Sequence, residues 1–236
     1  MDYSVVAELV AHLRAADIAD DVACVLINAA GSVFSAGADL REFQEELGQS
    51  ASDFYESGAV WEDLFTFVPT MGIPIVVEID GAARAGATGL VALADFVVAS
   101  DKATFGLSEI KIGLFPIMVL PMIIRVIGYR RALDLALTGR IVDAKEAAEI
   151  GLVTRVVEPD RVHEAAAALA EELASNPPVA MSYGRRLLAQ LADMRYDDAV
   201  HHARTMRGVF MHGEEIGEGV SAFLEKRKPA WQEGGI

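Results

Sequence analysis

Apolar residues follow a helical period near the start of the chain and gather in short runs further along it. Between residues 4 and 16 they recur every three or four positions, which predicts a helix (Val5, Val6, Leu9, Val10, Leu13). Short apolar, β-prone runs at residues 22–28, 75–79, 96–99 and 153–157 predict buried strands.

Segments with helical patterning lie between and after these runs. Residues 41–68 predict an interrupted helix, residues 85–94 a short one, and residues 161–228 helices broken at Asn176-Pro177-Pro178. Residues 31–40 are rich in small residues and predict a loop. Strands that alternate with helices predict an α/β fold with a parallel sheet covered on both faces. We divide the chain into a core over residues 1–160 and a helical region over residues 161–236.

Composition narrows the function classes. The chain has 236 residues, 53% of them hydrophobic, and a net charge of −15 from 20 Lys and Arg against 35 Asp and Glu. This charge argues against nonspecific binding to nucleic acid or to an anionic membrane. The apolar run at residues 112–124 is too short to span a bilayer, and the beginning of the chain lacks a secretory pattern. A single cysteine, Cys24, excludes an intrachain disulfide and fits a small core residue in a cytoplasmic protein.

Two loops rich in small residues each follow a predicted strand and precede a helix, at residues 34–40 and 80–89. Loops at the carboxyl ends of parallel strands form ligand crevices, and the first N–H groups of a helix have no partner within it. One N–H from each loop could form an oxyanion hole. Each loop is also consistent with a tight turn that only eases packing. The second loop fits neither a phosphate-binding P-loop nor G-x-G-x-x-G, which disfavours a nucleotide site.

Five segments together resemble the crotonase (enoyl-CoA hydratase/isomerase) superfamily, in its order and over essentially the whole chain. They lie at residues 34–43 (FSAGADLREF), 73–81 (IPIVVEIDG), 103–114 (ATFGLSEIKIGL), 137–153 (LTGR to IGLV) and 222–229 (AFLEKRKP). The resemblance implies a ββα spiral of mostly parallel sheets and a C-terminal helical trimerisation region. It also implies an acyl-CoA substrate, a homotrimer or hexamer, no metal, and no cofactor beyond the coenzyme A of the substrate.

The same resemblance assigns the site. It places the oxyanion-hole amides on Ala38 and Gly86 and the substrate contacts on a further set of residues (Ala36, Asp39, Leu40, Gly89, Phe115, Pro116). The two glutamates of the family's hydratases match Gly89 and Glu109, and the aspartate of some isomerases matches Ile117. Glu109 is therefore the one acid at these positions. We expect isomerisation or hydration of an enoyl-CoA with Glu109 as a single acid/base.

Alternatives stay open at this point. Glu109 could be an exposed carboxylate or an ion-pair partner of Lys111, and the chain could be a non-catalytic acyl-CoA binding protein that has lost its second acid. Asp39 is expected to cap the following helix. Arg84 could contact the substrate, pair with Glu109 or Asp95, or have only a surface role. Four aromatic residues could line an acyl pocket or belong to the core (Phe54, Trp61, Phe65, Phe67). An N-terminal hairpin of the family is expected to be missing.

Overall fold

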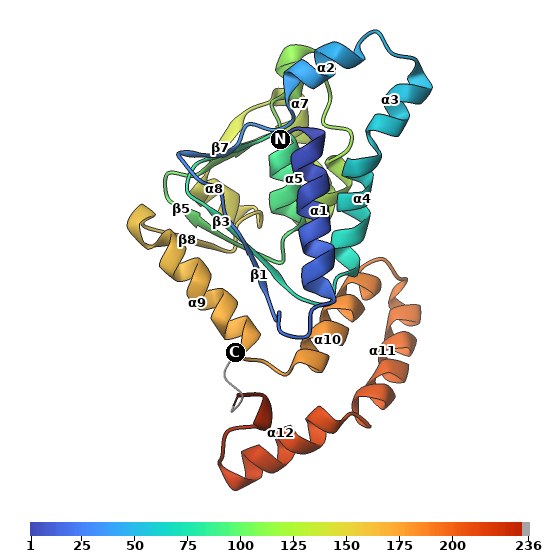
Figure 1. Cartoon of the computed structure of the whole chain (residues 1–236), viewed down its shortest axis with the longest axis vertical. Coiled ribbons are helices and arrows are strands. Elements are labelled where there is room, and N and C mark those ends of the chain that lie inside the picture. The colour runs from blue at the N-terminus through green and yellow to red at the C-terminus, as the bar shows by residue number, and fades with distance from the viewer. Residues whose placement is uncertain (233–236) are drawn as a thin grey trace.

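Two four-stranded sheets form the centre of the computed structural model, which describes residues 1–232 (Figure 1). The first sheet has the order β1-β3-β5-β8 and is parallel throughout. The second has the order β2-β4-β6-β7, with only the β6–β7 pair antiparallel. The strands are β1 (Val25–Ile27), β2 (Val33–Ser35), β3 (Ile75–Ile79), β4 (Ala82–Arg84), β5 (Phe96–Ser100), β6 (Thr104–Gly106), β7 (Ile141–Asp143) and β8 (Arg155–Val157).

The sequence predicted the first sheet and missed the second. All four predicted strands occur, in one parallel sheet. The expectation that residues 31–40 and 80–89 are loops without strands was wrong, because they contain β2 and β4. These two strands contain small or polar residues, so they lack the apolar run that marks β1 in the sequence.

Strands β1 to β6 alternate between the two sheets, so a ββα unit such as β3–β4–α5 makes one turn of a spiral. The turn between β3 and β4 passes very close to the chain between β1 and β2. A Cβ on Gly81 would lie 2.2 Å from the carbonyl oxygen of Ser32, so only glycine fits there. The mixed spiral matches the fold class expected from the sequence.

Helices cover both sheets. They are α1 (Tyr3–Asp17), α2 (Leu40–Glu46), α3 (Ala51–Ser57), α4 (Ala59–Phe67), α5 (Gly86–Leu93), α6 (Leu120–Ile127), α7 (Tyr129–Thr138), α8 (Ala144–Glu149), α9 (Val162–Ala174), α10 (Pro178–Leu191), α11 (Tyr196–Phe210) and α12 (Glu214–Glu225), with 3₁₀ turns η1 (Val68–Thr70), η2 (Glu109–Ile112), η3 (Pro159–Arg161) and η4 (Ala230–Gln232). The predicted first helix is α1, and the predicted break at residues 176–178 separates α9 from α10.

Strand β3 is buried on both faces, as its apolar residues predict, and Glu78 is half-buried. Ile75, Val77 and Ile79 belong to the main core, which includes buried residues of α1, α4 and α5. Val76 faces the other way and packs in a smaller cluster with Leu169 of α9. Figure 1 shows α1, α4 and α5 on one side of the first sheet and α9 on the other. This arrangement fixes the strand ends from which the candidate site is built.

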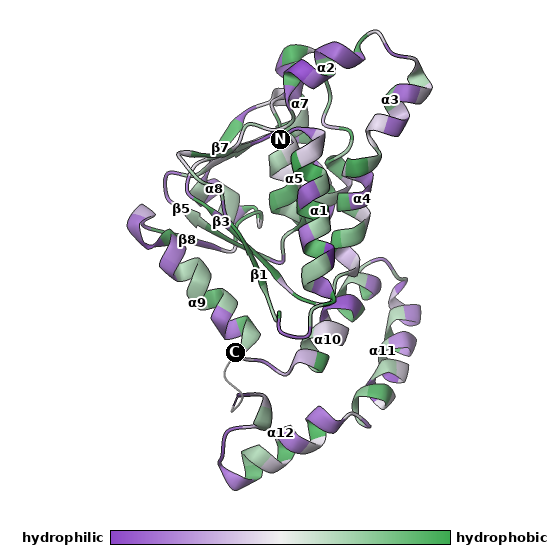
Figure 2. Cartoon of the chain, viewed as in Figure 1, coloured by the Kyte–Doolittle hydropathy of each residue, from purple (hydrophilic) through white to green (hydrophobic). Residues whose placement is uncertain are grey.

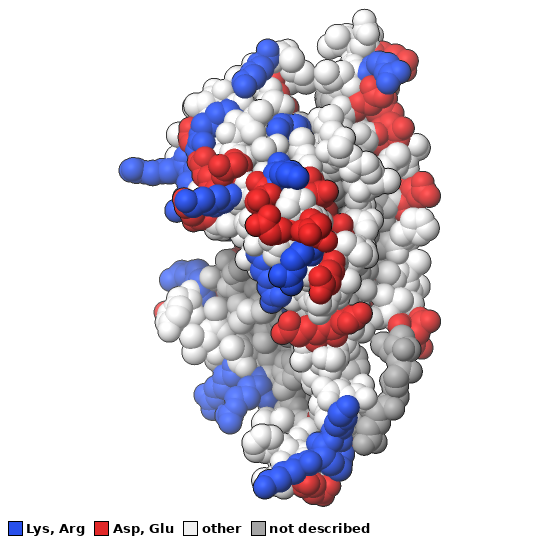
Figure 3. All heavy atoms as spheres, turned by 90° about the vertical axis from the view of Figure 1, so that its left-hand side faces the viewer, with Lys and Arg blue, Asp and Glu red and all other residues white. Residues whose placement is uncertain are grey.

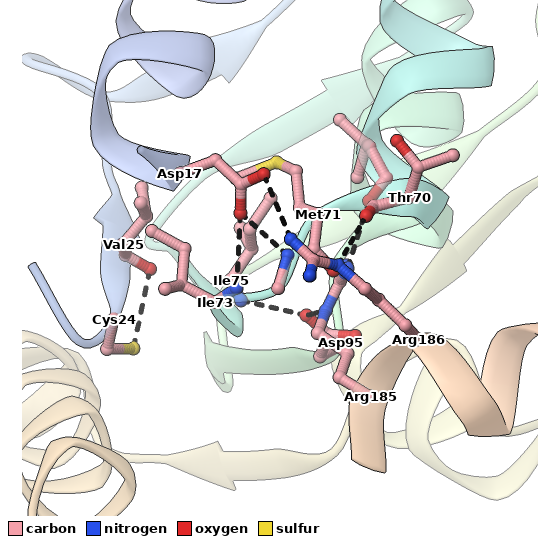
Figure 4. Close-up of polar contacts among 12 residues, drawn as sticks. Asp17, Cys24, Val25, Thr70, Met71, Ile73, Ile75, Asp95, Arg185 and Arg186 are labelled. Atoms are coloured by element: carbon pink, nitrogen blue, oxygen red, sulfur yellow. Dashed lines mark hydrogen bonds and ion pairs between the residues drawn. The ribbon is translucent and has the colours of Figure 1, made fainter. Parts of the chain in front are cut away.

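Two arginines of helix α10 form hydrogen bonds with the core (Figure 4). Arg185 Nε donates to Asp95 Oδ2 at 2.8 Å, and its Nη1 donates to the carbonyl oxygen of Met71 at 2.6 Å. Arg186 donates to the carbonyl oxygen of Thr70 at 3.1 Å. These polar contacts join α10 to η1 and to Asp95 before β5, beside half-buried apolar residues of the helix such as Met181 and Leu187.

Helices α11 and α12 form an arm that leads away from the sheets (Figure 1). Figure 2 colours parts of α12 as hydrophobic, although Ala222 is its only buried residue within the described chain. Phe223 and Leu224 are 82% and 74% exposed. Between positions 1 and 232, no helix combines the length and apolarity needed to cross a bilayer.

The surface carries charges of both signs. On the face drawn in Figure 3, Lys and Arg side chains lie among Asp and Glu side chains and do not form one continuous basic surface. Arg140 illustrates the pairing, because it contacts Glu146 at 2.6 Å and Asp134 at 2.7 Å. This distribution is consistent with the net charge of −15.

Candidate active site

The two loops rich in small residues meet at one end of the second sheet. Strands β2 and β4 are parallel neighbours, with Val33 opposite Ala82, so the loops after them leave the sheet side by side. A Cβ built on Gly37 would lie 2.7 Å from Ala85 Cβ and 3.6 Å from Gly86 N. The segments that carry Ala38 and Gly86 are therefore in direct contact.

The turn that leads into α5 has an unusual backbone. Ala85 has φ 54° and ψ −126°, a conformation that residues with a Cβ rarely adopt. The Ala85 N–H donates to the carbonyl oxygen of Gly106 at 2.9 Å. The Thr88 hydroxyl donates to the same oxygen at 3.1 Å and lies 3.2 Å from that of Ala83. These contacts hold the strained turn and so fix the direction of the Gly86 N–H.

Two backbone donors remain available at this point. Among residues 1–232, neither the Ala38 nor the Gly86 N–H donates a hydrogen bond to the protein. Gly86 is the first residue of α5, where N–H groups lack intrahelical acceptors and carry partial positive charge. Two such N–H donors from loops in contact could together stabilise negative charge that develops on a bound carbonyl oxygen.

The other predicted contacts of the first loop lie around Ala38. Ala36 is exposed, and Leu40 begins α2 with 55% of its surface exposed. Asp39 caps α2, since its Oδ1 accepts from the Arg41 N–H at 2.9 Å, which confirms the expected capping role. Its carboxylate is therefore already used in ordering the loop.

Glu109 begins η2, three residues after β6 ends at Gly106, whose carbonyl holds the turn before Gly86. Its Oε2 is buried and has no hydrogen-bond partner among the described residues. Burial raises the pKa of the Glu109 carboxyl above its ordinary value, although a backbone hydrogen bond partly opposes the shift. The described part of the chain contains no ion pair between Glu109 and Lys111, so that alternative was wrong.

Arg84 does not contact either of its proposed acidic partners. Its guanidinium donates to the carbonyl oxygen of Thr104 at 2.6 Å and to the Thr104 hydroxyl at 2.8 Å. Partial burial lowers the pKa of Arg84. The possible pairing with Glu109 or Asp95 is thus wrong, and the side chain links β4 to β6.

Comparisons with known proteins identify the family to which a chain with this site belongs. The sequence profile described as "Enoyl-CoA hydratase/isomerase" matches residues 1–234. The chain belongs to the enoyl-CoA hydratase/isomerase family. It is 36% identical over 208 residues to a putative enoyl-CoA hydratase of Thermus thermophilus, covering 88% of this chain and 82% of the relative. It is 34% identical over 224 residues to a probable enoyl-CoA hydratase of Rhizobium meliloti, covering 94% and 84%.

Solved structures of enoyl-CoA hydratases have the same fold as this chain. The crystal structure of an enoyl-CoA hydratase from Mycobacterium smegmatis superimposes with a TM-score of 0.92 at 29% identity, covering 98% of this chain and 89% of that one. Human enoyl Coenzyme A hydratase domain-containing protein 3 gives a TM-score of 0.92 at 27% identity, with coverage of 98% and 90%. These likenesses confirm membership of the crotonase superfamily.

The two positions at which members of this family can have a second acid, 89 and 117, have apolar residues in this chain. Gly89 is buried in α5, and a Cβ on it would lie 2.4 Å from Val119 Cγ1. Ile117 is 70% exposed on the segment after η2. On the same segment, Phe115 is 40% exposed and Pro116 is buried. Of the three matched positions, only Glu109 presents a carboxylate.

An aromatic wall from α4 closes one side of the site. A Cβ on Gly86 would lie 3.3 Å from Trp61 Cη2, and the Trp61 and Phe65 ring centroids are 5.7 Å apart. Both side chains belong to the main core, whereas Phe54 is 46% exposed and packs 6.4 Å from Phe43. Of the aromatic residues considered for an acyl pocket, Trp61 and Phe65 therefore lie near the amide pair, whereas Phe54 packs against Phe43.

Sequence reasoning missed Thr88 and Val119, which surround the site without a recognisable motif. The hydroxyl of Thr88 within a loop of small residues was the available signal. A cavity of about 330 Å³ lies behind Phe65, between Met122 and Leu188, and its lining includes neither Ala38, Gly86 nor Glu109. The described residues contain no group of three or more His, Cys, Asp or Glu that could hold a metal ion.

Proposed function

We propose that this chain acts on an enoyl-CoA thioester as an isomerase-type enzyme, with Glu109 as its single acid/base. The N–H groups of Ala38 and Gly86 hold the thioester carbonyl oxygen. Ala36, Asp39, Leu40, Gly89, Phe115 and Pro116 line the path of the substrate and its coenzyme A. Coenzyme A belongs to the substrate, and no separate cofactor is needed.

One observation carries the proposal: the buried, unpartnered Oε2 of Glu109. A buried carboxyl without an ion-pair partner costs free energy, because its charged form is poorly solvated. Its raised pKa brings it closer to the range in which it can both accept and return a proton. A merely structural carboxylate would normally have a partner.

The chemistry needs one proton carrier. The Glu109 carboxylate removes a proton from C2 of a 3-enoyl-CoA, breaking the C2–H bond. The electron pair passes into a dienolate whose oxygen accepts from Ala38 and Gly86 N–H. Glu109 then returns the same proton to C4, the C3=C4 bond moves to C2=C3, and no atom is gained or lost.

A spectrophotometric assay tests this proposal. Wild type should convert a 3-enoyl-CoA to its conjugated isomer, and Glu109→Gln should lower kcat by about 10²–10⁴-fold, the usual contribution of a general acid/base. Glu149→Gln, at an exposed carboxylate on α8, is the matched control and should retain activity. Equal rates for wild type and Glu109→Gln would contradict the role of Glu109.

Two other functions remain testable in the same assay. Hydration with Glu109 alone would appear as loss of the conjugated absorbance when 2-enoyl-CoA is supplied. A non-catalytic acyl-CoA binding protein would bind a saturated acyl-CoA in calorimetry and turn over neither substrate. The names of the relatives favour an enzyme, since those described above are called enoyl-CoA hydratases.

The oligomer is proposed to be a trimer or a pair of trimers. The arm of α11 and α12 forms with α10 an apolar groove of about 920 Å³, lined by residues such as Tyr183, Phe210 and Phe223. A groove of this kind on a single chain is typical of a subunit interface. Light scattering should give a multiple of three chains, and Phe223→Ser should lower the molar mass. A cytoplasmic location stays a prediction, because a relative from Dictyostelium discoideum is named as mitochondrial.

A further inference from the structure

Val119 occupies the space into which a side chain at position 89 would project. A Cβ on Gly89 would lie 2.4 Å from Val119 Cγ1, 2.8 Å from Val119 Cβ and 3.7 Å from Phe65 Cζ. Contacts below 3.0 Å are essentially never made by real Cβ atoms. Even alanine at position 89 therefore requires Val119 to move.

Val119 is held firmly in this place. It is 3% exposed, and its backbone precedes α6, accepting from the Ile123 N–H at 3.1 Å and donating to the Pro116 carbonyl at 3.3 Å. Met122 and Ile123, one turn further along, are buried in the same core. A β-branched side chain also has few rotamers, so its isopropyl group does not turn aside at low cost.

Position 89 lies one helical turn after Gly86, whose N–H is a proposed oxyanion donor. The methyl groups of Val119 therefore fill the space beside the first turn of α5, which begins with this donor. Addition of water to C3 needs room for a water molecule and a group that orients it. At this position the chain provides an apolar wall and no polar atom.

We infer that Val119 determines which reaction the site performs, by excluding both a second carboxylate and an attacking water from the side of Gly89. The inference rests on the proposed function, since it concerns the fate of the 2-enoyl-CoA that Glu109 and the amide pair produce. With water excluded, C3 of this conjugated product is not attacked, and the product leaves the site without being hydrated. Val119 is thus a specificity-determining residue rather than a simple filler of the core.

The decisive variant combines Gly89→Glu with Val119→Ala. The new carboxylate then has space to take a proton from water, whose oxygen bonds to C3 of a 2-enoyl-CoA. The C2=C3 electron pair passes to the enolate, and protonated Glu109 delivers a proton to C2. Hydration should rise at least about 100-fold over wild type, a value at the low end for one added general base. Gly89→Gln with Val119→Ala is the control and should not hydrate.

A single variant keeps the inference testable if the double variant does not fold. Val119→Ser removes two methyl groups, adds one hydroxyl and should cost at least about 2 kcal/mol of stability. It should raise the ratio of hydroxyacyl-CoA to isomerised enoyl-CoA at least about fivefold, because the hydroxyl supplies a polar partner for a water molecule in the vacated space. An unchanged product ratio in a folded Val119→Ser variant would overturn the inference.

Isomerisation of a 3-enoyl-CoA by wild type, followed by the absorbance of the conjugated product, separates this inference from the proposed function. This reaction reports only Glu109 and the amide pair. Isomerisation by wild type without hydration by the folded double variant overturns the role of Val119 and leaves the proposed function standing. Absence of isomerisation by wild type overturns both. Hydration by Gly89→Glu alone would also show that Val119 is no barrier.

Discussion

Gly37→Ala tests whether contact between the two loops is what builds the oxyanion hole. Gly37 has φ +100°, and an added Cβ would lie 2.7 Å from Ala85 Cβ and 3.1 Å from the Arg84 carbonyl oxygen. Backbone and a short β-carbon cannot move aside as the end of a flexible side chain can. The methyl group should push the loop that carries Ala38 away from Gly86.

The expected magnitude has two parts. An L-residue in the left-handed region costs about 1–2 kcal/mol, and overpacking adds about 1–3 kcal/mol. Gly31→Ala is the matched control, because Gly31 has φ +93° but nothing lies within 4 Å of its added Cβ. Gly31→Ala should therefore show only the backbone cost, about 1–2 kcal/mol.

The two variants should differ much more in catalysis than in stability. Loss of one oxyanion donor lowers kcat by about 10²–10³-fold, and Gly37→Ala should approach this range in the isomerase assay. Gly31→Ala should stay close to wild type. Urea unfolding of both variants measures the stability terms. If folded Gly37→Ala keeps kcat within about threefold of Gly31→Ala, contact between the loops is not needed, and the reasoning fails.

Three further predictions concern the groups around this site. Because burial raises the pKa of Glu109, the rate should rise with pH at a midpoint above the ordinary glutamate range. The same shift means that the folded state keeps the Glu109 proton to higher pH than the unfolded state does. The stability that this group contributes is therefore full below its pKa in the unfolded state and is lost as the pH rises through its pKa in the folded state. In urea unfolding, Glu109→Gln should lack this loss of stability with rising pH. Thr88→Val should lower kcat about tenfold with little change in KM, because the hydroxyl that helps Gly106 hold the turn before Gly86 is lost, and Thr88→Ser should restore it; an equal loss with serine would contradict a hydrogen-bonding role. Arg185→Leu should cost about 2–4 kcal/mol by leaving Asp95 without its ion pair, and limited proteolysis should then cut near α10 first, whereas unchanged cleavage would contradict the attachment shown in Figure 4.

Parts of the site could be predicted because they depend on local chemistry. The cap formed by Asp39, the two donor-bearing loops and the carboxyl group of Glu109 are each encoded within about ten residues. The strands of the second sheet could not be predicted in this way. Each contains a small or polar residue such as Ser35, Arg84 or Asp143, so no apolar run marks it in the sequence.

The sequence by itself determined the α/β class, the first sheet, the family and the single acid at position 109. Periodicity, turn residues and motifs are local properties, so they can be recognised in the amino-acid sequence alone. Only the tertiary structure decided that Gly37 touches Ala85 and that Val119 fills the space beside Gly89. Steric exclusion depends on distances between residues remote in the chain, and no local pattern records those distances. The sequence shows only that position 89 lacks a side chain, whereas the structure shows that Val119 occupies the space which that side chain would fill.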